Sequence, residues 1–131
     1  EPNTLHYLRL PTKEDTVLAQ NIGRSLHQIP GERAISFIQK NSATNWEIKK
    51  LDTETMLIST IAPTLPSRED ICWTPDGKII SSDGTKLFVF DPKKGKSWKE
   101  IPLASGAEML KGVSRLAINS KGDKLAVVVA E

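Results

Sequence analysis

The sequence is poor in cysteine, in histidine and in long hydrophobic runs, and each shortage removes a class of protein. One cysteine, Cys72, stands among the 131 residues, which excludes an intrachain disulfide and a cysteine-cluster zinc site. The two histidines do not have the spacing of a metal-binding motif. No run of about 18 apolar residues occurs, so no segment is expected to cross a bilayer as a helix.

An excess of charge of one sign is also missing. There are 18 Lys and Arg side chains against 16 Asp and Glu, a formal net charge of +2 at pH 7. This excess is too small to favour nucleic acid or an acidic membrane as a partner. The sequence lacks a G-x-S-x-G nucleophile elbow and a glycine-rich phosphate loop, so it supports neither an acyl-transfer nor a nucleotide-using enzyme. From these residues we predict no catalytic residue, no cofactor and no bound metal.

In place of long amphipathic helices, the sequence has internal repetition. Three strand–turn–strand segments place Pro30, Pro75 and Ser120 at equivalent positions, each 45 residues from the next. A second set of strand residues recurs at intervals of 41 and 39 residues: Leu10, Leu51 and Phe90. Two interleaved periods of about 40–45 residues are typical of the four-stranded blades of a β-propeller.

Turn chemistry divides these repeats into strands. Pro75-Asp76-Gly77 supplies a preset φ followed by a glycine, which predicts a tight turn, and Asp83-Gly84 predicts a second hairpin. With strands labelled a to d from the propeller axis outward, we predict an all-β fold of about twelve antiparallel strands. They are c and d at 5–10 and 16–22; a to d at 25–29, 33–40, 46–51 and 56–61; a to d at 70–74, 78–82, 86–90 and 98–103; and a and b at 114–119 and 124–130. One short helical turn is expected within 104–111.

This layout is a β-propeller segment with two complete blades between two half-blades. The chain 1–131 is expected to divide into blade parts 1–23, 24–63, 64–104 and 105–131. Closed propellers have about four to eight blades, and strands left unpaired at each end would invite edge-to-edge pairing. We therefore expect the C-terminal half of a larger propeller, with covalent continuation in a longer parent chain. A homodimer that completes a six-bladed ring is the alternative.

One repeat resembles a known family. Residues 73–80, W-T-P-D-G-K-I-I, resemble the W-S-P-D-G-K-x-I/L-A-F blade signature of the TolB-like propellers, which are related in architecture to WD-repeat propellers. Residues 120–127 are a looser copy, and 29–34 lack the Asp-Gly pair. The resemblance implies a non-catalytic binding module in the periplasm or outside the cell, although no residue here rules out the cytoplasm. The alternative function is a metal-dependent, lactonase-like propeller hydrolase, or the propeller portion of a hydrolase.

Candidate site residues follow from the propeller layout. The d–a and b–c loops share one face of a propeller, where ligand sites usually lie around the axis. The candidates on this axial face are Arg24, Ser25, Arg68, Glu69, Asp70 and Arg115. These alternating charges are expected to hold a protein or a small polar ligand, or else to form a ring of ion pairs between blades. Under the hydrolase alternative, Glu69 and Asp70 would be metal ligands.

Two further features bear on this face. The 45-residue spacing aligns His27 with Cys72 and Ala117, and these small partners favour a packing role for the histidine over a catalytic one. The b–c loop 40–45 is longer than its counterpart at Asp83-Gly84. A loop extended in one repeat is as consistent with a recognition element as with a tolerated insertion.

Overall fold

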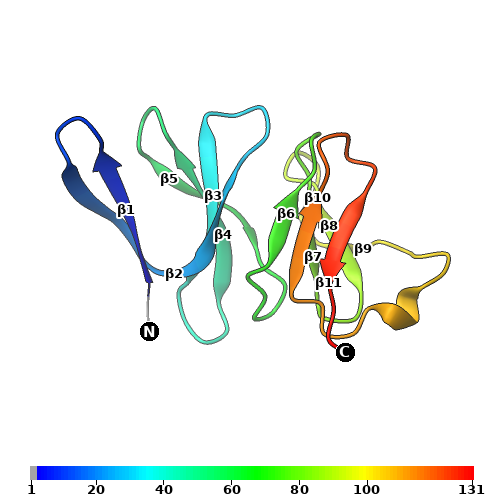
Figure 1. Ribbon diagram of the computed structural model, residues 1–131. Helices are drawn as coiled ribbons and strands as arrows, with labels where there is room; N and C mark the ends of the chain where they lie inside the picture. The colour runs from blue at the N-terminus through cyan, green and yellow to red at the C-terminus, as the bar shows by residue number, and fades with distance from the viewer. Residues whose placement is uncertain (1–2) are drawn as a thin grey trace.

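The chain folds into antiparallel β-sheets that stand side by side. The computed structural model describes residues 3–131, and Figure 1 shows β1 at the left, β3 to β5 in the middle and β6 to β11 at the right. The strands are β1 (Asn3–Arg9), β2 (Glu14–Gln28), β3 (Ala34–Lys40), β4 (Trp46–Asp52), β5 (Ile58–Pro63), β6 (Ile71–Trp73), β7 (Ile79–Ser82), β8 (Leu87–Phe90), β9 (Lys99–Glu100), β10 (Arg115–Ile118) and β11 (Leu125–Val128). The all-β prediction is confirmed for these residues. The sheets do not close into a ring.

We divide these strands into four layers. Strands β1 to β5 are hydrogen-bonded as one five-stranded sheet, in which β1 pairs with the first part of β2 and β3 with its second part. We call β1 with the first half of β2 the N-terminal hairpin, and the second half of β2 with β3, β4 and β5 sheet I. Strands β6 to β9 form sheet II, and β10 with β11 forms the C-terminal hairpin. Neighbouring strands in each layer are consecutive in the chain and antiparallel. Every connection within a layer is therefore a hairpin, as the turn signals predicted.

The first prediction that the structure overturns concerns the strand count. Strands were predicted separately at 16–22 and 25–29, but β2 runs without a break from Glu14 to Gln28, so residues 3–131 contain eleven strands. The pairing of β2 with β3 shifts between Ile22 and Leu26, and Asn21 has a left-handed φ of 56°. The strand thus bends between two layers. Because the linker holds no proline, each of its residues keeps a backbone N–H that can take part in strand pairing.

Sheet II is shorter at its outer edge than predicted. The strand expected at 98–103 is reduced to Lys99–Glu100. Pro102 cannot donate a ladder hydrogen bond, which is one reason for the early end. The helical turn expected within 104–111 is a 3₁₀ turn, η1 (Ala107–Met109), that follows Gly106 in a left-handed conformation. The described residues form no helix that is long and apolar enough to cross a membrane.

We call the turns that follow β2, β6 and β10 the inner turns. They repeat one geometry at the predicted spacing of 45 residues. In each, the backbone N–H of one residue donates to the carbonyl three residues before it, at 2.9–3.2 Å. The pairs are Glu32 with Ile29, Gly77 with Thr74, and Gly122 with Asn119. Gly77 and Gly122 take left-handed φ values of 86° and 75°, which glycine adopts without steric cost. Turns 45 residues apart are therefore closed by the same hydrogen bond.

We call the turns that follow β1, β4 and β8 the outer turns. They share a second geometry. Here an N–H donates to the carbonyl four residues before it, at 2.6–2.7 Å. The pairs are Lys13 with Arg9, Met56 with Asp52, and Gly95 with Asp91. Backbone N–H groups of the turn also donate to the carboxylates of Asp52 and Asp91, an Asx turn that reinforces the reversal. These three turns thus share a second pattern of closing hydrogen bond.

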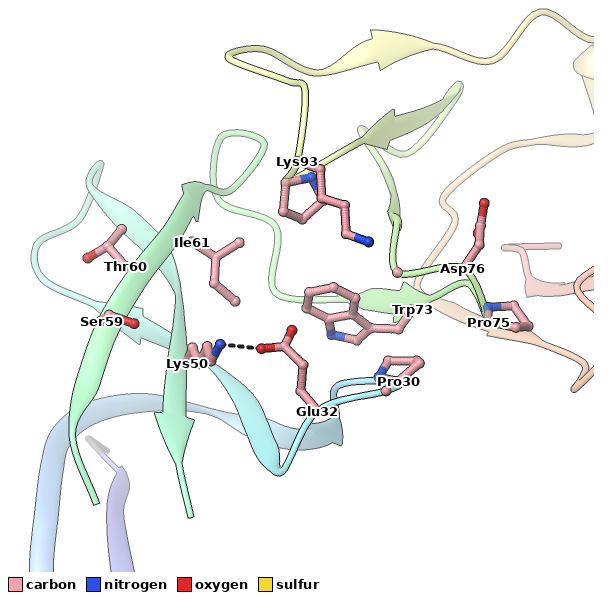
Figure 2. Close-up of a pocket in the computed structure, with 13 residues that line it drawn as sticks. Pro30, Glu32, Lys50, Ser59, Thr60, Ile61, Trp73, Pro75, Asp76 and Lys93 are labelled. Atoms are coloured by element: carbon pink, nitrogen blue, oxygen red, sulfur yellow. Dashed lines mark hydrogen bonds and ion pairs between the residues drawn. The ribbon is translucent and has the colours of Figure 1, made fainter. Parts of the chain in front are cut away.

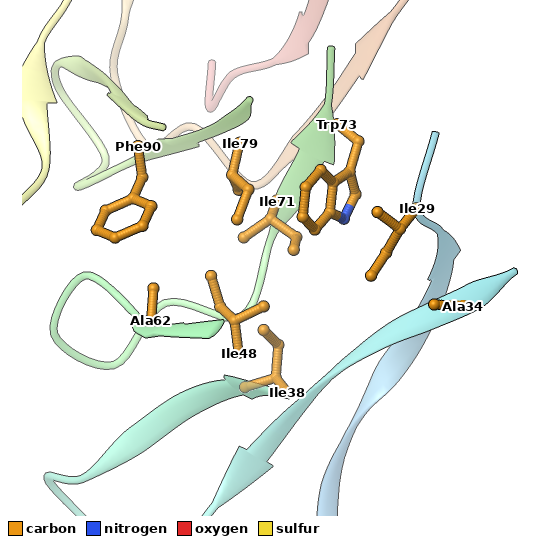
Figure 3. Packing of buried hydrophobic residues seen from close by; sticks show 9 residues of the cluster. All are labelled: Ile29, Ala34, Ile38, Ile48, Ala62, Ile71, Trp73, Ile79 and Phe90. Carbon is orange, nitrogen blue, oxygen red and sulfur yellow. The ribbon is translucent and has the colours of Figure 1, made fainter. Parts of the chain in front are cut away.

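Three apolar interfaces hold the four layers together. Sheets I and II face each other across the largest one, drawn in Figure 3, which contains Ile29, Ala34, Ile38, Ile48 and Ala62 of sheet I and Ile71, Trp73, Ile79 and Phe90 of sheet II. Leu5, Ile22, Phe37 and Leu51 join the N-terminal hairpin to sheet I. Leu87, Leu110 and Val113 form the base on which the C-terminal hairpin packs. Side chains that alternate along each strand thus cover both faces of sheets I and II.

Candidate functional site

Most of the predicted site residues meet at one cavity. It has a volume of about 370 Å³ and lies where sheet I, sheet II and the C-terminal hairpin adjoin. Its lining residues are Asn3, Arg24, Lys40, Trp46, Ser67, Arg68, Glu69, Asp70 and Arg115. Five of the six predicted residues are in this set, although they come from three different layers. Ser25 does not line it. We call this space the charged cavity.

Two ion pairs in the charged cavity link residues that are 45 positions apart in the sequence. Arg24 on β2 contacts Glu69 at 3.6 Å between Nε and Oε1. Arg115 on β10 donates to Asp70 at 2.9 Å between Nη1 and Oδ1. Each pair thus links segments of neighbouring layers. Partial exposure limits each pair to about 0–1 kcal/mol.

Glu69 is the most strongly engaged carboxylate of the cavity. Besides Arg24, it contacts the ammonium of Lys40, which also lies 4.4 Å from the centre of the Trp46 ring in a cation–π contact. Burial pushes the pKa of Glu69 upward, but Lys40 and Arg24 outweigh it, and the pKa stays below its usual value. Glu69 is therefore a fixed negative charge at neutral pH.

Arg68 is the cation that has no carboxylate partner among the described residues. Its guanidinium Nη2 donates to the backbone carbonyl of Asp83 in the b–c loop of sheet II. It also lies against Gly84, where an added Cβ would stand only 2.7 Å from Nη2. The half-buried Arg68 is thus held in place without being neutralised, and most of its donors stay free.

The loop that carries Arg68 contains a strained residue. The N–H of Arg68 donates to the carbonyl of Leu65 at 3.1 Å, so Pro66 and Ser67 occupy the centre of a four-residue turn. Ser67 has a φ of 55°, and glycine is the residue usually found at such a position of a turn that begins with proline. Strain from a left-handed backbone at a non-glycine residue is often stored at functional sites. Here it sets the direction in which the chain enters Arg68.

Sequence reasoning missed four members of the charged cavity: Asn3, Lys40, Trp46 and Ser67. Lys40 and Trp46 flank the b–c loop of sheet I, which the sequence marked as longer than its counterpart. The rule that d–a and b–c loops share a face was a usable signal for these two residues. Ser67 gave no comparable signal, because its φ is visible only in the folded backbone.

A second and larger cavity lies at the inner and outer turns, between sheets I and II. It has a volume of about 660 Å³ and is lined by Pro30, Gly31, Glu32, Lys50, Ser59, Thr60, Ile61, Trp73, Pro75, Asp76, Gly77, Pro92 and Lys93. Figure 2 shows the Trp73 ring with Ile61 and the ion-paired Lys50 and Glu32 on one side of it and Pro75 and Asp76 on the other. The sequence predicted no site here. The buried Trp73 indole donates to Ser36 Oγ at 2.8 Å across the sheets.

His27, Cys72 and Ala117, the row of residues that the 45-residue spacing aligns, lie near one another in the structure. All three line one cavity between the inner strands β2, β6 and β10. Burial lowers the pKa of His27 below its usual value, and the negative charge of Asp70 opposes this only in part. Burial also raises the pKa of the Cys72 thiol to about 11, so the thiol is protonated and unreactive at neutral pH. The row contains no activated nucleophile.

Comparison of the chain with protein-family models, with curated proteins and with solved structures found no match. Within residues 3–131, no group of three or more His, Cys, Asp or Glu side chains is arranged to hold a metal ion.

Proposed function

We propose that the chain is a segment of a TolB-like β-propeller and serves as a non-catalytic binding module, with the charged cavity as its ligand site. The observation that carries the proposal is the meeting of five predicted residues, from three layers, at one cavity. Residues that converge from repeats in this way are typical of a ligand site at the axial face of a propeller.

The propeller architecture is supported by the repeated geometry. Inner turns 45 residues apart share one hydrogen bond, and outer turns share another. The aligned residues His27, Cys72 and Ala117 of three inner strands line one space. Successive layers pack face to face through apolar side chains. Each of these features is expected when blades of one design are placed around an axis.

A propeller of this kind needs further layers on both sides. β1 and β11 each pair on one side only within the described residues, and these are the positions of a c strand and a b strand. Further blades from a longer chain, or a second copy, would supply the missing partners. Light scattering distinguishes the two, since a mass of twice 14.5 kDa supports the homodimer and a monomer rules it out.

The hydrolase alternative requires Glu69 and Asp70 to coordinate a metal. Both carboxylates already contact cations, Glu69 two of them and Asp70 one. A divalent cation would have to displace these partners and enter a cavity with more positive than negative side chains. The ion pairing therefore favours the binding module. Saturable binding of Ca²⁺ to the chain that is lost in Glu69→Gln would reverse this preference.

A nuclear magnetic resonance (NMR) screen of small polar molecules tests the proposed site. The library should contain neutral, cationic and anionic compounds, added singly to the ¹⁵N-labelled chain. We expect binders to shift the amide signals of Arg24, of residues 67–70 and of Arg115. Binding that maps only to the cavity around Trp73, or no binding by any class of compound, would contradict the proposed site.

A further inference from the structure

We infer that the charged cavity takes a small oxyanion, a carboxylate or a phosphate, through the guanidinium of Arg68. This inference rests on the proposed function, because it names the ligand class of the same site. The first supporting observation is the charge of the side chains that line the cavity. Four cationic side chains line the cavity, Arg24, Lys40, Arg68 and Arg115, against the two carboxylates of Glu69 and Asp70. The cavity thus carries an excess of two positive charges.

The pairing of these charges decides which cation is available. Glu69 engages Arg24 and Lys40, and Asp70 engages Arg115. Arg68 alone among the four contacts no carboxylate in the described residues, and its one hydrogen bond goes to the neutral carbonyl of Asp83. A guanidinium has five N–H donors in a planar fork that matches a carboxylate or a phosphate. Arg68 is therefore the lining cation whose charge no carboxylate of the described residues offsets.

Arg68 is also held ready for a ligand. The Asp83 carbonyl fixes one edge of its guanidinium, and the absence of a side chain at Gly84 gives it room to lie against the b–c loop. The turn at Ser67 determines the course of the backbone immediately before it. A donor held in this way loses little conformational entropy when an anion binds.

The remaining lining limits the size and character of the ligand. A volume of about 370 Å³ is within the range of small-molecule pockets, which is about 300–1,000 Å³. Lys40, held by Glu69 and Trp46, adds a second positive charge and an aromatic surface beside it. The cavity therefore suits a small acid with one or two negative charges, since two charges would match its excess.

The test is a titration of the whole chain with malonate and, separately, with inorganic phosphate. Sodium chloride keeps the ionic strength constant, so that general screening does not change. Amide NMR signals report the site and calorimetry reports the affinity. We expect at least one anion to give saturable shifts at residues 67–70 and at Asp83 and Gly84. Binding of malonate alone identifies a carboxylate ligand, and binding of phosphate alone identifies a phosphate ligand.

Arg68→Gln is the decisive variant, and Lys121→Gln is its control with the same change of charge. Lys121 is exposed in the turn of the C-terminal hairpin. Arg68→Gln should weaken anion binding by about tenfold or more, because charge-assisted hydrogen bonds are lost, whereas Lys121→Gln should change it by less than about twofold. Arg68→Lys keeps the charge without the planar fork, so it should fall between wild type and Arg68→Gln.

Each outcome bears on the inference. Equal affinity in Arg68→Gln and wild type overturns it, as does the binding of neutral or cationic molecules at this cavity while neither anion binds. In the latter case the proposed function survives and only the ligand class is wrong. The absence of binding by compounds of any charge removes both. If Arg68→Gln does not fold, Arg68→Lys carries the test, and wild-type affinity in that variant contradicts a role for the guanidinium.

Discussion

Sheet II and the C-terminal hairpin contain equivalent strands in different surroundings. All residues of β6 and β7 are buried, whereas the residues of β10 and β11 alternate between exposed and partly buried. Their turns are closed by the same hydrogen bonds, 45 residues apart. The difference is in the neighbours, because sheet II packs against a layer on each face and the C-terminal hairpin packs on one. Local sequence thus specifies the strand pair, and the adjacent layers supply most of its burial.

The largest test of this comparison is a matched pair of core truncations. Ile79 opens β7 with none of its surface exposed, and Leu125 opens β11 half-buried. Ile79→Ala should lower the free energy of unfolding by about 2–5 kcal/mol. Leu125→Ala should cost about 1 kcal/mol, since less surface is buried there. Urea denaturation measures both. Equal losses would show that the C-terminal hairpin is covered in solution as fully as sheet II.

The same comparison shows what the sequence specifies. The turn at Pro75-Asp76-Gly77 and the 45-residue alignment of Asp70 with Arg115 follow from local chemistry and repetition, and both hold in the structure. The unbroken course of β2 could not be predicted from local chemistry, because the left-handed φ of Asn21 lets the strand bend without ending. Local sequence cannot distinguish a bent strand from two strands when no proline separates them.

The residues of the charged cavity could likewise be predicted from the sequence only in part. Register alone brought Arg24 to Glu69, since equivalent positions in adjacent repeats become neighbours. Lys40 lies outside that register, at the end of β3 and beside a loop whose predicted length differs from that of its counterpart. The cavity around Trp73 depends on how far apart the turns of two sheets lie, and the packing of buried side chains decides that distance. Such lateral spacing has no counterpart in the order of residues along the chain.

A smaller effect is expected from the hydrogen bond that joins sheets I and II. Ser36→Ala removes the acceptor of the Trp73 indole N–H, which is buried and bonded at 2.8 Å. An unsatisfied buried donor costs about 1–3 kcal/mol. Ser120→Ala, at the exposed turn of the C-terminal hairpin, should change stability by less than about 0.5 kcal/mol. If both variants lose the same free energy by urea denaturation, the hydrogen bond does not stabilise the interface.

Substitution by glycine should change the free energy of unfolding in opposite directions in the linker to sheet II and in the linker to the C-terminal hairpin. Ser67 in the linker to sheet II has a φ of 55°, so Ser67→Gly relieves strain and should raise the free energy of unfolding by about 1 kcal/mol. Ser105 lies in the linker to the C-terminal hairpin and has no positive φ. Ser105→Gly only adds freedom to the unfolded chain and should be neutral or slightly destabilising. A loss of stability in Ser67→Gly would show that the serine side chain, and not strain relief, dominates there.

The smallest expected effect is the pH dependence contributed by His27, on the sheet I side of the row it shares with Cys72 and Ala117. Burial holds the pKa of His27 in the folded chain below its value of about 6.5 in the unfolded chain. The unfolded state therefore binds the proton first as the pH falls, so this histidine favours folding above the unfolded pKa and loses that contribution as the pH falls toward the folded pKa. His27→Gln removes the titration without removing the polar side chain. The stability of the variant, measured by urea denaturation between pH 7.5 and 5 (a range of about one unit or more on either side of that value), should decline less than that of wild type. An unchanged decline would show that His27 does not contribute to the pH dependence of stability in this range.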